Sequence, residues 1–311
     1  MAINSLPTRP VIISTDPGID DAVAISLALF SDDIDVKLIC PIAGNVDLKK
    51  TTYNVQRLLT FLEKEVPVVP GSSSPLLRVS KDASNVHGES GMDGFNFPNP
   101  TITPVVTKTA VQAMHETVLT SSTPVTLVGI GPLTDIALYL HLYPQDKERI
   151  HEIVLMGGAL GRGNFGVLSE FNFGVDPEAA KIVFNSNISI RMAPMEIGRQ
   201  AKIMPNTSEK IKSLGKIGEM FYSLFAHYRG GSFSKGLNMY DVLALGLILK
   251  PEMFEIEPTY VSIETQGTLT GGASLIDLKG YLGKESNAKV ATEVDAEQFE
   301  KWFTEMVAKT I

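Results

Sequence analysis

The sequence predicts an α/β protein with an open, mostly parallel central sheet flanked by helices, folded as a single domain over residues 1–311. Short apolar runs alternate with amphipathic stretches over most of the chain, which is typical of strand–helix–strand units in a parallel sheet. No linker rich in Pro, Gly and Ser separates two halves. Hydrophobic residues make up 44% of the chain, which is enough for a large core.

The predicted elements follow this rhythm from the N-terminus onward. We expect strands at 11–15, 36–41, 66–69, 124–129, 151–156 and 188–193, and helices near 20–30, 48–64, 105–121, 132–142 and 176–186. A helical pattern covers 206–250, two β-like segments lie around 256–265 and 273–282, and a final helix covers 295–310. Glycine-rich stretches at 71–74, 88–94, 157–166 and 229–236 are expected to be loops. Loops at the carboxyl ends of the strands carry the functional site in such sheets.

Composition excludes several classes of function. The net charge is −8, with 27 basic and 35 acidic residues, and no basic cluster suits a nucleic-acid partner. No run approaches 18 apolar residues, and the first ten residues lack the apolar centre of a signal peptide, so we expect a cytoplasmic protein that makes no membrane contact. Cys40 is the only cysteine, which excludes a disulfide framework, and its apolar neighbours predict a core position.

The segment VIISTDPGIDDA, residues 11–22, crowds three carboxylates between a strand and a helix. Helix capping accounts for Asp20 or Asp21, because carboxylates accept hydrogen bonds from the free N–H groups of a first helical turn. Capping does not account for Asp16, and repulsion within such a cluster raises carboxyl pKa values unless a cation is bound. Calcium prefers oxygen ligands of this kind, so the pattern indicates a metal-binding or catalytic site.

A phosphatase of the haloacid-dehalogenase type is the first alternative to weigh. Those enzymes also place an aspartate nucleophile at the end of a strand, with a second aspartate two residues later. Gly18 occupies that second position here, and no phosphate-binding lysine motif is evident. This departure counts strongly against phosphoryl transfer through Asp16.

Several ordered segments resemble the signatures of the inosine-uridine-preferring nucleoside hydrolases. They are DPGIDDA at 16–22, PIAGN at 41–45, HGESGMDG at 87–94, LVGIGPLTDIA at 127–137, MGG at 156–158, Asn164, EFN at 170–172, VDPEAA at 175–180 and the pair Tyr240-Asp241. The match covers roughly residues 10–250. It implies a Rossmann-like nucleoside hydrolase fold and calcium-dependent hydrolysis of the N-glycosidic bond of ribonucleosides to ribose and free base, a step of nucleoside salvage.

The resemblance also implies roles for individual residues and an assembly. The Ca²⁺ ligands would be Asp16, Asp21, the main-chain carbonyl of Ile130, and Asp241, with Asp16 also the catalytic base. Asp20 and Asn172 would hold ribose hydroxyls, Asn164 and Glu170 would reach towards the 5′ end, and Asn45 would orient the carboxylates. Met156 either lines the ribose pocket or finishes a buried strand. Relatives are commonly oligomeric, so we expect a homodimer or homotetramer.

Two positions depart from the family pattern. Ser14 stands where many members have an aspartate, and its hydroxyl is expected to bond a metal-binding carboxylate. Tyr240 stands where many members have a histidine that protonates the leaving base. Tyrosine is a poorer acid near neutral pH, but it can donate a hydrogen bond to the base or stack on it. His87, His227 and Arg229 are the candidate substitute donors.

A second function stays open at this point. Because of Tyr240, the chain could be a calcium-dependent ribose- or nucleoside-binding protein with weak or lost turnover, and release of free base would distinguish the two.

The remaining residues of interest are expected to be structural. His115, His141 and His151 are surface or packing residues, Asp176 is a helix cap before Pro177, and Trp302 docks the final helix.

Overall fold

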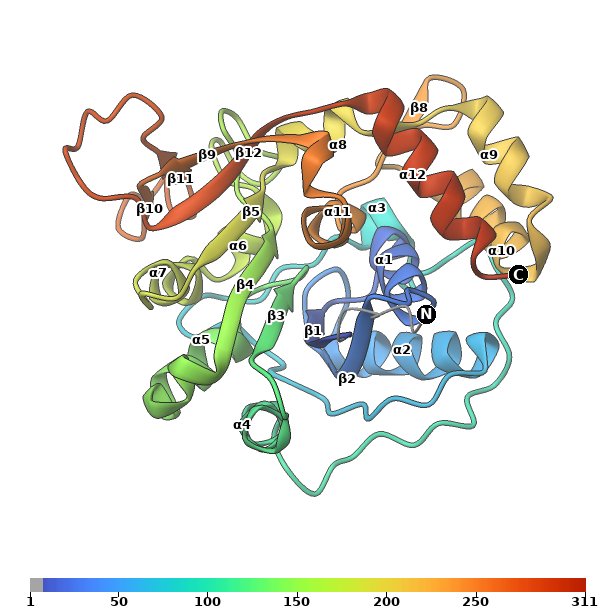
Figure 1. Cartoon of the computed structure of the whole chain (residues 1–311), viewed down its shortest axis with the longest axis horizontal. Helices are drawn as coiled ribbons and strands as arrows, with labels where there is room; N and C mark the ends of the chain where they lie inside the picture. The colour runs from blue at the N-terminus through green and yellow to red at the C-terminus, as the bar shows by residue number, and fades with distance from the viewer. Residues whose placement is uncertain (1–7) are drawn as a thin grey trace, which may run out of the picture.

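The computed structural model describes residues 8–311, which fold around a seven-stranded sheet with helices on both sides (Figure 1). The strands lie in the order β2-β1-β3-β4-β5-β12-β9. Their bounds are β1 Arg9–Thr15, β2 Ile34–Pro41, β3 Val125–Gly129, β4 Ile150–Met156, β5 Ile190–Ala193, β9 Phe254–Thr259 and β12 Ala288–Val294. Neighbouring strands are parallel except β12 and β9. The predicted open, mostly parallel sheet is confirmed.

Successive side chains of a strand point to opposite faces of the sheet. Alternate residues of the central strands therefore belong to two apolar cores, one on each face. Val11 and Ile13 lie in one core and Ile12 in the other. The first core packs against α1 Ile19–Leu29, α2 Leu48–Leu62, α10 Gly215–His227, α11 Val242–Leu249 and α12 Ala296–Ala308. The second packs against α4 Ala110–Thr120, α5 Thr134–Leu142 and α7 Pro177–Phe184. Cys40 and Trp302 are buried in these cores as predicted.

Shorter elements complete the fold around the sheet. They are α3 Ser84–His87, α6 Phe171–Val175, α8 Met195–Gln200, α9 Pro205–Lys212, the 3-10 turns η1 Pro144–Arg149 and η2 Pro251–Met253, and the short strands β6 Lys202–Ile203, β7 Gly231–Ser232, β8 Gly236–Asn238, β10 Val261–Ile263 and β11 Ser274–Ile276. Strands β6, β7 and β8 form a small sheet of their own. Among residues 8–311, no helix is both long and apolar enough to cross a bilayer.

Two predictions about strands were wrong. Residues 66–69 make only an isolated bridge from Val68 to β2, because the prolines at 67 and 70 have no N–H to donate to a ladder. Strand β12 was missed, although it joins β5 to β9 inside the main sheet. The region 206–250 is also not continuously helical, since β7 and β8 interrupt it.

The carboxyl ends of β1, β3 and β4 meet at one edge of the sheet, and the register brings three sequence motifs together there. Ser14 pairs with Gly129 of β3, and the N–H of Ile130 donates to the Ser14 carbonyl at 2.9 Å. Asp16 therefore leaves β1 beside the turn that follows β3. Met156 ends β4 at the same edge. This is the position at which parallel α/β sheets place their ligand sites.

Candidate active site

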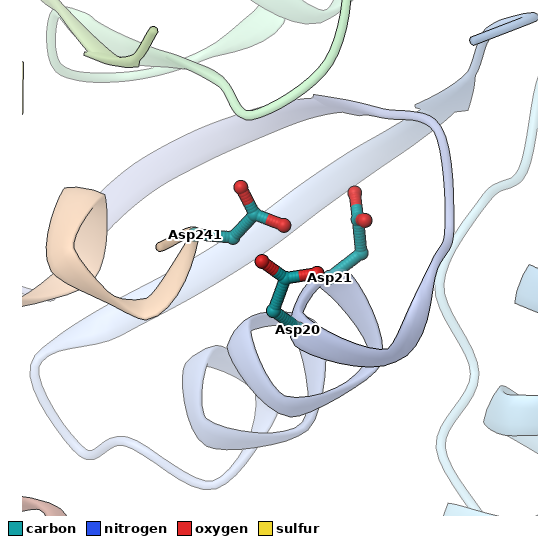
Figure 2. A group of neighbouring side chains, drawn as sticks. All are labelled: Asp20, Asp21 and Asp241. Carbon is teal, nitrogen blue, oxygen red and sulfur yellow. The ribbon is translucent and has the colours of Figure 1, made fainter. Parts of the chain in front are cut away.

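The centre of the site is a group of buried carboxylates that converge from two segments of the chain. Asp20 and Asp21 lie in the first turn of α1, and Asp241 precedes α11 (Figure 2). One oxygen of each of these carboxylates lies within 4.8 Å of the others. Asp16, between β1 and α1, is also buried, at 1% exposure. The three aspartates of the first motif and the distant Asp241 are thus brought together.

Asp21 is bound on both oxygens by neighbours of the strand–helix turn. The N–H of Gly18 donates to it at 2.9 Å and the hydroxyl of Thr15 at 2.6 Å. The side-chain amide of Asn45 donates to it as well, at 3.2 Å. Asp21 therefore accepts a hydrogen bond from the free N–H group at the start of α1, and its charge remains in the cluster. Three donors of this kind favour an ionised carboxylate.

Asp16 keeps one oxygen atom free for another partner, and the carboxylate of Asp241 is not used to cap its helix. The N–H of Asn45 donates to Oδ2 of Asp16 at 2.7 Å, but Oδ1 is buried and has no hydrogen-bond partner in the described chain. Asp241 occupies the cap position of α11, yet its carboxylate makes no capping hydrogen bond. A buried carboxylate oxygen without a donor is strongly unfavourable unless a cation is bound.

Burial raises the pKa of every carboxyl group in the cluster, and repulsion between carboxylates adds to the rise for Asp16, Asp21 and Asp241. Desolvation is the main cause for Asp16, followed by the charge of Asp21. For Asp241, desolvation is followed by the charges of Asp20 and Asp21. Desolvation raises the pKa of Asp20 to about 6. The orphaned oxygen of Asp16 and this repulsion both fit a bound metal ion, which the cluster could hold.

The closest set of carboxylates differs from the predicted ligand set in one member. It contains Asp20, which the resemblance assigns to ribose, in place of Asp16. Asp20 is also bound by the hydroxyl of Tyr228, which donates to its Oδ2 at 3.0 Å. The carbonyl of Ile130, the predicted main-chain ligand, accepts a 3.3 Å hydrogen bond from Asn172.

A cavity of about 420 Å³ opens beside the cluster, which is large enough for a small ligand. Most of the predicted site residues line it: Asp16, Asp20, Asn45, His87, Ile130, Met156, Asn164, Glu170, Asn172, Arg229, Tyr240 and Asp241. Asp21 is fully buried, on the protein side of the cluster. The predicted residues therefore surround one space, although they come from segments spread over more than two hundred residues.

The residues predicted to bind ribose form a connected framework on one wall. The side-chain amide of Asn172 donates to the Met156 carbonyl at 3.1 Å. Glu170 caps α6 by accepting from the N–H groups of Asn172 and Phe173, and it also accepts from Gly158 at 2.9 Å. Burial nevertheless raises the pKa of Glu170 to about 7.

Asn164 lies on the same wall but is exposed. Its side-chain oxygen accepts a hydrogen bond from the N–H of Phe171, at 2.9 Å. Met156 both ends β4 and lines the cavity. A position at the end of a buried strand and a position in the cavity wall are therefore compatible for this residue. The wall is therefore built from the end of β4, the loop that contains Asn164, and the start of α6.

His87 also lines the cavity. Its Nδ1 accepts the N–H of Ile19 at 3.2 Å, so the ring hydrogen of the neutral form is on Nε2. Burial lowers the pKa of His87 to about 4, and the ring is neutral at physiological pH. Its ring centroid lies 5.6 Å from that of Tyr228. His87 is thus placed as a neutral hydrogen-bond donor.

The structure places two expected participants differently. His227 is exposed at the end of α10, where Nδ1 lies 3.2 Å from the Ser223 carbonyl and the ring covers Gly94, so it is not brought to the cavity. The next residue, Tyr228, lines the cavity instead, and our sequence reasoning missed it. Ser14 is buried and its hydroxyl has no partner in the described chain. The hydroxyl of Thr15 binds the carboxylate instead.

The remaining histidines and Asp176 have the structural roles that were predicted. His115 binds Asp146 at 2.6 Å, and His141 and His151 are exposed. Asp176 caps α7 by accepting from Ala179. Besides Tyr228, the sequence reasoning missed Asn238 and Met195, which also line the cavity.

Comparison with known proteins gives a consistent result. The model of the family described as inosine-uridine preferring nucleoside hydrolase matches residues 11–301. The non-specific ribonucleoside hydrolase RihC of Klebsiella pneumoniae is 44% identical over 299 residues, which cover 96% of this chain and 98% of that protein. RihC of Salmonella paratyphi B is also 44% identical, over 298 residues that cover 96% and 97% of the two chains.

Solved structures share the fold over nearly the whole length. The purine-preferring ribonucleoside hydrolase from Gardnerella vaginalis has a TM-score of 0.89 at 25% identity, and the match covers 97% of this chain and 99% of that one. An inosine-guanosine nucleoside hydrolase has a TM-score of 0.88 at 27% identity, with 96% and 98% covered. The chain therefore belongs to the inosine-uridine preferring nucleoside hydrolase family and is an enzyme of the nucleoside-hydrolysing class.

Proposed function

We propose that the protein hydrolyses the N-glycosidic bond of ribonucleosides, giving ribose and free base, and that it requires Ca²⁺. The observation that carries the proposal is the buried carboxylate cluster on one wall of a cavity of about 420 Å³, with Oδ1 of Asp16 left without a partner among residues 8–311. Carbonyl and carboxylate oxygens are the ligands that calcium prefers. We assign Asp16, Asp21, Asp241 and the Ile130 carbonyl as its ligands.

The residues of the cavity suit this chemistry. Breaking the bond to the base develops positive charge on the ribose ring, which a dense group of carboxylates stabilises. Asp16, whose Oδ1 is free, takes the proton of the attacking water. When bound, the cation supplies Lewis-acid polarisation of that water and a fixed anchor for sugar hydroxyls. Asp20 and the side-chain oxygen of Asn172 accept hydrogen bonds from the ribose hydroxyls, since the amide nitrogen of Asn172 already donates to the Ile130 and Met156 carbonyls.

The cavity offers neutral hydrogen-bond donors to the leaving base. Tyr240 and His87 both line the cavity, and burial favours the neutral form of each. A neutral donor stabilises the electron pair that remains on the base as the bond breaks. Because purines and pyrimidines both have acceptor atoms, we propose that inosine and uridine are both substrates. The RihC relatives are named non-specific, which supports this proposal.

Three broader proposals rest on the family resemblance. The reaction would serve nucleoside salvage in the cytoplasm, with a small nucleoside as the partner molecule. The enzyme would assemble as a homodimer or homotetramer. Light scattering coupled to gel filtration measures the assembly directly, and a monomeric mass would contradict that part of the proposal.

The test uses wild type, Asp16→Asn and an exposed control, Asp33→Asn, each with calcium. Wild type and the control should release ribose and base from inosine and uridine, whereas Asp16→Asn should lose activity by about a hundredfold or more while it keeps its circular dichroism spectrum. A wild type that hydrolyses no nucleoside in a broad panel overturns the enzymatic proposal. Nucleoside binding by calorimetry without release of base would instead support the binding-protein alternative.

A further inference from the structure

The hydroxyl of Tyr240 lies near two side chains, Asn238 and Arg199, that carry hydrogen-bond donors. Tyr240 lines the cavity directly before Asp241. Asn238, at the end of β8, donates its side-chain N–H to the Tyr240 oxygen at 3.1 Å. Helix α8 packs closely against the other side of the ring, since a Cβ atom on Gly198 would lie 2.2 Å from Cδ1 of Tyr240. The ring is therefore held between α8 and β8.

Arg199, the residue after Gly198, brings a positive charge to the same place. Its Nη2 lies 3.8 Å from Sδ of Met195, and Met195 lines the cavity. Burial raises the pKa of the Tyr240 phenol and the positive charge of Arg199 lowers it, so the guanidinium lies close to that hydroxyl. A guanidinium has only donors, and it stays charged in proteins. The phenol oxygen therefore accepts a hydrogen bond from one amide and lies near one cation.

The neighbours of the Tyr240 hydroxyl limit which groups can accept its hydrogen. A phenol has one hydrogen and two acceptor sites on its oxygen. Both neighbours present donors, so neither can accept the phenol hydrogen. The nearby carboxylate of Asp20 accepts the hydroxyl of Tyr228 at 3.0 Å, and no hydrogen bond joins it to the Tyr240 hydroxyl in the described chain. The hydrogen of Tyr240 is left for a group in the cavity.

We propose that Arg199 and Asn238 are positioning residues that fix Tyr240 as a hydrogen-bond donor to the leaving base. The inference rests on the proposed ribonucleoside hydrolase function and deepens it. The bond between C1′ and the base nitrogen breaks with its electron pair on the base, while the water oxygen forms the new bond to C1′ and its proton passes to Asp16. Tyr240 keeps its proton and stabilises the negative charge on an acceptor atom of the base, which later gains a proton from solvent.

This arrangement defines the class of leaving group that depends on Tyr240. A nucleobase is a poor leaving group and needs the donor, whereas p-nitrophenolate leaves without one. Nucleoside hydrolysis should therefore depend on Arg199 and Asn238, and hydrolysis of p-nitrophenyl β-D-ribofuranoside should not. A purely structural role for these residues would affect both substrates alike.

The experiment measures kcat and KM of the calcium-loaded enzyme with inosine, uridine and the nitrophenyl riboside. The variants are Arg199→Met, Arg199→Lys, Asn238→Asp and Tyr240→Phe, with the remote Arg149→Met as the matched control. We expect Arg199→Met and Asn238→Asp to lower kcat on both nucleosides by roughly ten- to a hundredfold with KM little changed, since a displaced donor costs up to about a hundredfold. Arg199→Lys should restore part of the loss, and the nitrophenyl riboside should be hydrolysed at nearly the wild-type rate.

A double-variant cycle completes the test. In the Tyr240→Phe background, Arg199→Met should cause no further loss on inosine, because its effect acts through the missing hydroxyl. Equal losses on all three substrates, or additive losses in the cycle, would overturn the inference while the hydrolase function stands. Unchanged nucleoside rates in Arg199→Met would do the same. A wild type inactive on every substrate would overturn the proposed function and this inference together.

Discussion

Removing the cation should make the stability of the protein fall as pH rises. A carboxyl group whose pKa is raised in the folded state binds its proton more tightly there than in the unfolded chain. The folded protein then holds more protons, so the free energy of unfolding decreases with pH between the two pKa values. For Asp20 this window runs from 3.8 to about 6, and the shifts of Asp16, Asp21 and Asp241 have the same sign.

The expected magnitude follows from the Asp20 shift alone. A difference of about 2 pKa units corresponds to about 3 kcal/mol, and roughly half of it is lost above pH 5. Calcium at a hundred times its Kd should add about 2.7 kcal/mol. Because the proposed calcium would bind ionised carboxylates, its stabilisation should be larger at pH 8 than at pH 5, opposite to the trend of the stripped protein.

Urea unfolding of the metal-stripped protein at several pH values between 5 and 8 measures this effect. The single tryptophan, Trp302, is buried in α12 and reports unfolding, with circular dichroism as a second probe. Asp20→Asn should flatten the pH dependence, whereas the exposed Asp33→Asn should leave it unchanged. The reasoning fails if the stripped wild type is as stable at pH 8 as at pH 5, or if Asp20→Asn retains the full slope.

Three further predictions concern the supports of the site. Asn45→Ala, which removes donors to Asp16 and Asp21, should weaken calcium binding by about ten- to a hundredfold in calorimetry. Gly44→Ala would place a Cβ 2.0 Å from Oδ2 of Asp16 and should abolish base release, whereas Gly161→Ala, with its nearest neighbour at 3.7 Å, should not. Glu170→Gln should lower the urea-unfolding free energy by about 1–3 kcal/mol, because an amide NH₂ would face backbone donors; unchanged stability would contradict its capping role.

Much of the fold could be predicted because the central strands are local apolar runs bounded by turn residues. The exceptions have identifiable physical causes. Residues 66–69 look like a strand in composition, but flanking prolines limit their pairing to one bridge. In β12, Lys289 and Glu293 are exposed, but the alternation is broken because Val290 and Ala291 are both buried, and the partners β5 and β9 are set by tertiary pairing rather than by local sequence.

Some residues of the candidate site could also be identified from the sequence, and others could not. Asp16, Asp20 and Asp21 could be found because three carboxylates in six residues exceed what helix capping needs. Tyr228 could not, because its contact with Asp20 joins positions 208 residues apart. Neighbouring His227 offered more familiar chemistry, yet at the end of α10 its ring lies outside the cavity while that of Tyr228 lies inside. Side-chain direction at a helix end depends on packing that the sequence pattern does not reveal.

The hydrogen bonds around the cluster also bear on how its repulsion is relieved. Protons or a cation could neutralise the carboxylates, and burial alone favours protons. Asp21, however, accepts from Gly18, Thr15 and Asn45, and these donors stabilise its ionised form. The N–H of Asn45 does the same for one oxygen of Asp16 and leaves the other without a donor. These donors in the turn after β1 oppose part of the effect of burial, which supports the proposal that a cation neutralises the cluster.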